Sequence, residues 1–314
     1  MTTNAGGTGG PEEAGGATAT ADRRDFLKRA GTAAAAGAIG AGVIGYAATH
    51  KRGPAKDLVS GYRSGDIPLD PASSTWTRRS AFTVTMLQQN MATPHAPTLL
   101  VPSLKVRSLH NGTQIAFHIE WADTSKDELS GLARFNDAVA VQLATDVTQE
   151  AATAITMGVA GHPVHILQWK ASWQTDIDSG QKTSKDIFPN IYNDVRPEQL
   201  MTPEQAKVFY PGWATGNPLS QRDKKSPVEE LVAVGFGTLT THQEQEATGK
   251  GVHDGKRWRV VIALPMKGKG TNKAQVTPGE ARQVAFAVWN GGEGQRGSRK
   301  QYALWVPMQV EATA

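Results

Sequence analysis

The stretch LKVRSLHNGTQIAFHIEW, residues 104–121, decides the fold class. Apolar and polar residues alternate at its start, and a repeat of two residues is typical of a strand with one buried face. Asn111-Gly112 then interrupts the pattern. This dipeptide is a strong hairpin signal, because both of its residues tolerate positive φ. Residues 114–121 return as a second apolar strand, so we predict a β-hairpin over residues 104–121.

Other strand-like segments follow the same pattern, at residues 82–87, 138–143, 164–169, 257–264, 281–289 and 302–310. Turn-forming residues separate these segments, and no series of long amphipathic helices lies between them. This arrangement favours a sandwich or barrel over a fold of alternating strands and helices. We predict an all-β fold, an antiparallel β-sandwich. Residues 172–250 are rich in proline and polar turns, and we predict that they form loops and short helices lying over the sandwich.

An export signal is predicted near the N-terminus. The twin-arginine run Arg23-Arg24-Asp25-Phe26-Leu27-Lys28 precedes small and apolar residues from Ala30 to Thr49. These residues are mostly Ala and Gly, which suits the apolar part of a Tat signal better than a stable membrane span. The alternatives are an N-terminal membrane anchor and a chance basic pair before an Ala-rich helix. We therefore expect a periplasmic or other extracytoplasmic location, reached by the Tat route.

The chain is expected to form one domain after this signal. Residues 1–49 are predicted to be a disordered N-terminus plus the signal, and residues 50–75, with several Pro and Gly, are predicted to be a linker. Residues 76–314 then form the domain itself. All-β domains of this length commonly fold as a single unit.

Composition excludes several kinds of chemistry. The chain has no cysteine, which excludes disulfides, thiolate zinc sites, iron-sulfur ligation and covalent haem attachment. Lys and Arg number 33 against 29 Asp and Glu, so nothing indicates nucleic acid as a partner. The sequence has no nucleophile elbow, no His-Glu-x-x-His motif and no phosphate-binding loop that opens a helix. We therefore expect a protein that is not itself an enzyme.

Several segments resemble one known family. They are Gln89-Asn90-Met91, Glu120-Trp121-Ala122-Asp123, residues 134–142, Met157-Gly158, residues 163–171, 235–240 and 258–261, and Phe286-Ala287-Val288-Trp289-Asn290-Gly291. In this order they are similar to the haem b (gamma) subunit of type II DMSO reductase-family molybdoenzymes, such as ethylbenzene dehydrogenase, chlorate reductase, selenate reductase and dimethylsulfide dehydrogenase. The resemblance spans about residues 76–310. It implies a β-sandwich of the kind found in carbohydrate-binding and DOMON-like cytochrome domains.

The resemblance also implies a non-covalent haem b whose iron is held by a methionine and a lysine. It places the methionine on Met157 and the lysine on Lys300. Lys170 is the competing lysine, because it follows Met157 closely and ends a strand that could line the same pocket. In a period-two strand Lys170 points opposite to Trp169, and Trp169 is the better candidate for packing in the core. We therefore prefer Lys300 as the second ligand and count Trp169 among the residues that contact the cofactor.

Other polar side chains remain candidates. Arg134 and Arg259 could pair with the haem propionates, because a planar guanidinium suits a carboxylate. His165 and His118 are the alternative iron ligands, although most histidines in such strands are core or surface residues. His162 and His165 would lie on opposite faces of an extended strand, so this pair cannot readily chelate one ion.

The resemblance implies an electron-transfer subunit rather than a catalyst. Its partners would be a molybdenum catalytic subunit, an iron-sulfur subunit, and a cytochrome or other electron carrier. The alternative function is a haem-free carbohydrate-binding or adhesion β-sandwich, because the scaffold is shared and fold does not determine function. The eight tryptophans could stack on sugars in that case.

Overall fold

In the computed structural model, strands β4 (Ser103–His110) and β5 (Gln114–Ala122) form the predicted hairpin. Gly112 has a φ of 87°, and the Asn111 side chain accepts hydrogen bonds from the backbone N–H groups of Thr113 and Gln114 at 3.0 and 2.8 Å. Gly112 thus adopts the positive φ that the sequence favours, whereas Asn111 does not and stabilises the turn through its side chain.

The structure describes residues 57–313, except 183, 192–201, 203, 206, 207, 209 and 222. The twin-arginine motif and the apolar segment from Ala30 to Thr49 lie outside the described residues. The described residues belong to one unit, Lys56–Ala314. Within them, none of the helices combines the length and apolar character needed to cross a membrane.

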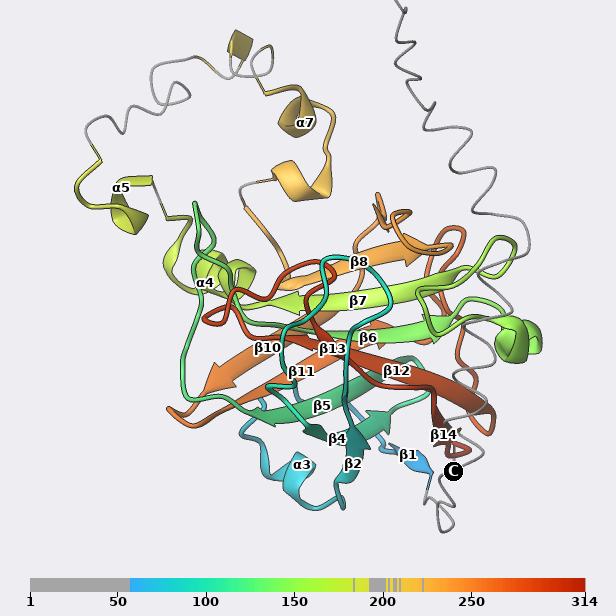
Figure 1. Ribbon diagram of the computed structural model, residues 1–314. Helices are drawn as coiled ribbons and strands as arrows, with labels where there is room; N and C mark the ends of the chain where they lie inside the picture. The colour runs from blue at the N-terminus through green and yellow to red at the C-terminus, as the bar shows by residue number, and fades with distance from the viewer. Residues whose placement is uncertain are drawn as a thin grey trace, which may run out of the picture. The chain divides into compact units, whose positions relative to one another are not determined.

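The described elements, with the labels of Figure 1, are mostly strands. Besides β4 and β5 they are β1 (Leu58–Tyr62), α3 (Ser74–Thr77), β2 (Phe82–Thr85), β3 (Leu87–Gln88), β6 (Ala138–Ala144), η1 (Val147–Ala152), β7 (Val164–Lys170), α4 (Ala171–Ser179), α5 (Ser184–Ile187), α7 (Pro211–Ala214), η3 (Pro218–Ser220), β8 (Val228–Ala233), β9 (Thr240–Thr241), β10 (Thr248–His253), β11 (Arg257–Pro265), β12 (Ala281–Trp289), β13 (Gln301–Tyr302) and β14 (Val306–Val310). The predicted all-β class is confirmed.

The described strands form one mixed sheet in the order β10-β11-β5-β4-β1-β14-β12-β6-β7-β8-β9. This sheet folds over, so that β12, β6 and β7 lie across β4, β5 and β11 (Figure 1). The main apolar core lies between the two layers. There Phe117 of β5 meets Phe286 of β12 edge to face at 6.3 Å, and Trp169 of β7 meets Trp258 of β11 at 5.0 Å between ring centroids. Aromatic contacts of this geometry stabilise beyond the apolar area that they bury.

Strand β1 corrects two of the sequence-based predictions. It lies within residues 50–75, which were interpreted as a linker, and it is parallel to both of its neighbours, β4 and β14. The sheet is therefore not wholly antiparallel. The strand was missed because it is short and contains Gly61. A Cβ at Gly61 would lie 2.3 Å from the Arg79 guanidinium, so this glycine leaves room for a side chain and does not mark a turn.

Strands β8 and β10 correct the prediction for residues 172–250, which were expected to contain only loops and short helices. Strand β8 was missed because consecutive glutamates interrupt its apolar pattern. Glu230 points into the protein, where it binds His165 Nε2 at 3.0 Å and Lys273 Nζ at 2.9 Å. Strand β10 was missed because it contains two glycines, and a Cβ at Gly251 would lie 2.2 Å from the Trp169 ring. The described helices between residues 171 and 220, namely α4, α5, α7 and η3, are short, as predicted for this part of the chain.

Candidate functional site

The candidate site lies on the face of β6, β7 and β12 that points away from the main core. Side chains alternate between the two faces of a strand, and in these strands the odd-numbered residues of β6 and β7 fill the main core. On the opposite face Ala287 pairs with Ala140, and Ala285 lies one pleat further along β12. All three alanines line a cavity. Side chains that end at Cβ leave room above the sheet, and the resulting floor is flat and apolar.

The cavity above this floor has a volume of about 400 Å³. Its walls come from three loops at residues 89–93, 155–157 and 236–239, from residues 297–303, which include β13, and from β7 and β8. Ile166, Leu231 and Trp289 contribute apolar surface beside the floor. A mostly apolar cavity with a few polar groups is typical of a site for an organic cofactor or ligand.

Met157 enters the cavity from the loop between η1 and β7. Its φ is 68°, a left-handed conformation that few residues other than glycine adopt. Neighbours hold this loop in place, because Gly235 N–H donates to the Met157 carbonyl at 2.8 Å and Trp305 Nε1 donates to Thr153 O at 3.2 Å. Gly158 follows, and a Cβ there would lie 2.9 Å from the Ala233 carbonyl oxygen. Backbone strain that the surroundings maintain is common at functional sites.

Lys300 enters the cavity from the loop before β13. Its Nζ lies 3.9 Å from Met157 Sδ and 5.3 Å from the centroid of the Trp289 ring. Among the described residues, no carboxylate forms an ion pair with Lys300. Burial lowers the pKa of its amine to about 8. An amine binds a metal only as the neutral base, so the cavity makes Lys300 a better ligand than an exposed lysine.

The Met157–Lys300 pair fits a single metal ion. Metal–sulfur and metal–nitrogen bonds in proteins, with zinc as the reference, are about 2.3 Å and about 2.1 Å long. One ion between the two atoms could bind both, because the 3.9 Å between Sδ and Nζ is shorter than the sum of these two bond lengths. No cluster of three or more histidine and carboxylate side chains is placed to hold a metal among the described residues.

Gln89 organises the cavity in a way that the sequence did not reveal. It is buried, and its Nε2 donates to Ala92 O at 2.7 Å and to Ser298 O at 2.8 Å. Its backbone N–H donates to Lys300 O at 3.1 Å. Gln89 thus connects the loop after β3 to the loop that carries Lys300 through hydrogen bonds. The available signal was the family resemblance, in which Gln89 begins the first matching segment, but the resemblance gave this residue no role in the cavity.

Lys170 and Trp169 occupy positions that correct the reasoning used to compare them. Trp169 lies in the main core against Trp121 and Trp258, and it does not line the cavity. Lys170, which points the other way, is on the same sheet face as the cavity. Its Nζ forms an ion pair with Glu229 and lies 4.6 Å from the Trp173 ring centroid. Lys170 is therefore distinguished from Lys300 by its anionic partner and not by the direction of its side chain.

The remaining predicted residues lie away from the cavity. His165 binds Glu230 at 3.0 Å on the core side of β7, and His118 stacks on Trp76 at 5.2 Å between centroids. Arg259 forms an ion pair with Asp254 at 3.4 Å. Arg134 lines a second, polar pocket, where its Cζ lies 5.5 Å from the Phe188 ring centroid.

This all-β domain places a methionine and a lysine in one apolar cavity, and the lysine has no carboxylate partner among the described residues. These features define a class of proteins that can bind a metal-containing organic cofactor. Comparison of the whole sequence with known proteins identifies the family. The chain matches the ethylbenzene dehydrogenase family over residues 73–301, and it belongs to that family. The resemblance stated from the sequence is confirmed.

A relative in Haloferax mediterranei is named as a respiratory nitrate reductase heme subunit. It is 25% identical over 254 residues, which cover 80% of this chain and 72% of the relative. Solved structures of a carbohydrate binding module of family 9 from Caldicellulosiruptor kristjanssonii are also similar. The glucose complex has a TM-score of 0.40 at 9% identity, covering 82% of this chain and 97% of that one. The cellotriose complex has a TM-score of 0.38 at 9% identity, covering 82% and 95%.

Proposed function

We propose that this chain is the haem b subunit of an extracytoplasmic molybdoenzyme complex and that it transfers electrons. The observation that carries the proposal is the separation of 3.9 Å between Met157 Sδ and Lys300 Nζ inside an apolar cavity. Membership of the ethylbenzene dehydrogenase family and the name of the Haloferax relative support the same cofactor. Bound haem would supply an iron that accepts and returns one electron.

The residues of the cavity suit that cofactor. The alanine floor of β6 and β12 accommodates a flat macrocycle, and Met157 and Lys300 supply the two iron ligands. A thioether is a soft, neutral ligand that favours ferrous iron and raises the reduction potential. Removal of water around Lys300 favours its neutral amine, which is the form that binds. In this proposal the protein contributes binding, orientation and the electrostatic environment.

The partners follow from the family resemblance. A molybdenum subunit would carry out the substrate chemistry, an iron-sulfur subunit would exchange electrons with this haem, and a cytochrome or other carrier would connect the complex to respiration. The respiratory name of the Haloferax relative supports such a complex. Export by the Tat route, with the signal removed or kept as an anchor, is part of the proposal and rests on Arg23 and Arg24.

The alternative function, carbohydrate binding without haem, has less support. Stacking on a sugar needs an accessible aromatic face. All eight tryptophans of the chain lie among the described residues, and each is buried or partly buried. Trp173, one of the partly buried ones, has the Lys170 and Lys224 ammonium groups 4.6 and 4.5 Å from its ring centroid.

Optical spectroscopy of the purified full chain tests the proposal. We expect a Soret band with the visible bands of six-coordinate, low-spin haem b. Met157→Ala and Lys300→Ala should each convert the spectrum to a five-coordinate or water-bound form that binds carbon monoxide. Lys170→Ala is the control for the competing lysine, and the haem that this variant binds should keep the low-spin band positions.

Two outcomes would contradict the proposal at different levels. If the chain binds no haem during expression or reconstitution, the cofactor is wrong. If haem binds but the spectrum survives both Met157→Ala and Lys300→Ala, the ligands are wrong and His165 or His118 becomes the candidate. A change with Lys170→Ala alone would assign the lysine ligand to Lys170.

A further inference from the structure

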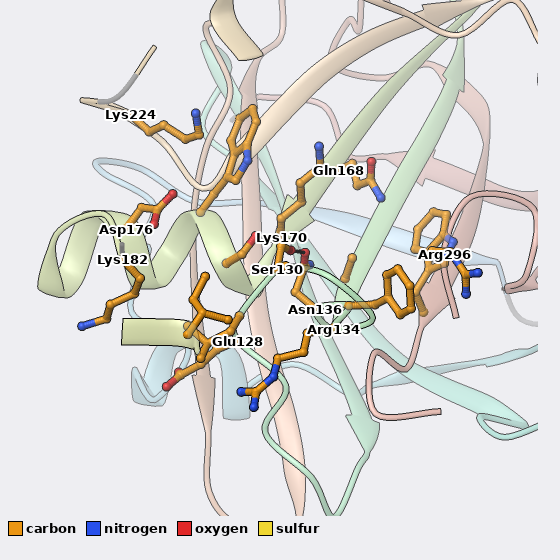
Figure 2. A pocket seen from close by; sticks show the side chains of 18 of the residues that line it. Glu128, Ser130, Arg134, Asn136, Gln168, Lys170, Asp176, Lys182, Lys224 and Arg296 are labelled. Carbon is orange, nitrogen blue, oxygen red and sulfur yellow. Dashed lines mark hydrogen bonds between the residues drawn. The ribbon is translucent and has the colours of Figure 1, made fainter. Parts of the chain in front are cut away.

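A second pocket, with a volume of about 550 Å³, lies between the loop before β6, strand β7, helix α4 and the loop after β12. Figure 2 shows its lining. The pocket is polar and contains five cationic side chains, Arg134, Lys170, Lys182, Lys224 and Arg296, against two carboxylates, Glu128 and Asp176. Its chemistry therefore contrasts with that of the apolar cavity.

The two cavities adjoin. Gln168, Trp289 and Gly297 line both of them. Trp289 Nε1 donates to Gly297 O at 3.0 Å, and this hydrogen bond closes one side of the shared boundary. Across the sheet Trp289 pairs with Ala138, which pairs with Lys170. The boundary thus has Lys170 on its strand side and Arg296, the residue before Gly297, on its loop side.

The cations at this boundary are not fully neutralised. Arg296 is exposed, its Cζ lies 4.0 Å from the Phe135 ring centroid, and its Nη1 donates to the Gly294 carbonyl at 2.8 Å. It forms no ion pair with a described carboxylate. On the other side Lys170 and Lys224 flank the Trp173 ring, and Glu229 is the ion-pair partner of Lys170 alone. An anion in the pocket would reduce the repulsion between these two ammonium groups.

A buried donor supports a polar ligand in the same place. Gln295 is 1% exposed and lines the polar pocket. Its Oε1 accepts a hydrogen bond from Asn290 N–H at 2.9 Å, but its Nε2 has no partner. A buried donor without an acceptor is costly, and it commonly marks a place where a ligand or water binds.

We propose that the polar pocket holds the two propionate carboxylates of the haem, with Arg296 as their main partner and Lys170 as the second. This inference rests on the proposed function. A haem has an apolar macrocycle and two carboxylates on one edge, and the structure offers an apolar cavity beside a cationic pocket, with Gln168, Trp289 and Gly297 lining both. Burial of a carboxylate without a cation or donor is unfavourable, so this polarity sets the orientation of the ring.

Arg134, the arginine selected from the sequence for this role, is a poorer candidate. Like Arg296 and Lys170 it lines the polar pocket and not the apolar cavity, but in the view of Figure 2 its guanidinium points away from Gln168, which lines both cavities. Because Arg134 is exposed and belongs to the same pocket, Arg134→Gln is a matched control for Arg296→Gln. Both variants remove one exposed guanidinium.

The experiment compares two ligands on the purified, haem-free full chain. These are iron protoporphyrin IX and its dimethyl ester, in which both propionates are uncharged. Arg296→Gln should weaken binding of the acid form about tenfold or more, the range expected for loss of a charged hydrogen bond. It should leave binding of the ester nearly unchanged, and Arg134→Gln should have little effect on either. Lys170→Gln should weaken binding of the acid form more than binding of the ester, after correction for the stability that is lost when Glu229 has no ion-pair partner.

Other results would overturn the inference. If Arg296→Gln weakens binding of both porphyrins equally, the arginine does not contact the carboxylates. The same conclusion follows if the variant binds both porphyrins as tightly as the wild type does. If Arg134→Gln, and not Arg296→Gln, selectively weakens binding of the acid form, the carboxylates lie at the Arg134 end of the pocket. Failure of the wild-type chain to bind either porphyrin would instead refute the proposed function, which separates the two failures.

Discussion

The buried amine of Lys300 should destabilise the haem-free protein. Its pKa is lowered from 10.5 to about 8 by burial. One pKa unit corresponds to about 1.4 kcal/mol, so the cost of keeping this amine protonated at pH 7 is about 3 kcal/mol. Replacing Lys300 removes this cost, but it also removes the contact between the ammonium group and the Trp289 ring, which contributes about 1 kcal/mol. We therefore expect Lys300→Met to raise the free energy of unfolding at pH 7 by about 2 kcal/mol.

The pH dependence has a definite sign. Between pH 8 and 10.5 the unfolded chain keeps a proton on Lys300 that the folded chain has lost. The unfolded state binds more protons, so the stability of the wild type rises with pH in that window. The difference in free energy of unfolding between wild type and Lys300→Met is thus fully present below pH 8 and should decrease as the pH rises to 10.5.

Urea unfolding of both haem-free proteins, at steps between pH 6.5 and 10.5, measures this difference. Subtracting the two free energies of unfolding at each pH cancels the contributions of other groups that titrate in the same range. Lys170→Met is the control, because it leaves the buried Glu229 without its ion-pair partner and should lower stability by about 3 kcal/mol. A Lys300→Met variant that is no more stable than wild type at pH 7, with a difference that stays constant as pH rises, would refute the reasoning.

Three further outcomes are expected. Ala287→Phe should fill the floor of the apolar cavity and abolish haem binding while far-ultraviolet circular dichroism stays native; retention of full haem affinity would show that the ring does not lie on this floor. Burial alone would raise the pKa of Glu230, but hydrogen bonds from His165 and Lys273 lower it to about 2, so the wild type should lose stability as pH falls from 4.5 to 2. Glu230→Gln should lower the free energy of unfolding by about 3 kcal/mol at pH 7, and its stability should not fall further between pH 4.5 and 2. If urea unfolding shows the same dependence of stability on pH for both proteins, the assignment is wrong. Replacement of Arg23 and Arg24 by lysine should keep the chain in the cytoplasm, and normal amounts across the membrane would exclude the Tat route.

The strands that sequence could predict are those whose side chains follow simple burial. The hairpin at residues 104–121 was predictable because alternation and turn chemistry agree there. Strand β8 was not, because its glutamates have partners, Lys170 and Lys273, that lie 59 and 43 residues away in the chain. A local pattern cannot show that a charge is neutralised by a distant residue. The prediction from 302 to 310 likewise missed the interruption between β13 and β14.

The candidate site was predictable only through the family resemblance. Met157 and Lys300 are ordinary residue types, and no spacing rule brings them within 3.9 Å of each other. Their role as ligands stays a prediction until the spectra are measured. The expectation that Trp169 contacts the cofactor was wrong, because the sequence does not show which face of β7 packs in the core and which face lines the cavity. Register with β6 and β12 supplies that information, and it exists only in the folded sheet.

The position of β1 has a consequence for how the chain folds. This strand bonds to β4 on one side and to β14 on the other, so one of its edges stays open until residues 306–310 have been synthesised. Closing a loop of that length has a large entropic cost, and non-local strand pairing of this kind is slow. A chain that stops before β14 would leave the facing edges of β1 and β12 unpaired. Open strand edges invite pairing between molecules, so truncated products of this protein should aggregate rather than remain as stable smaller domains.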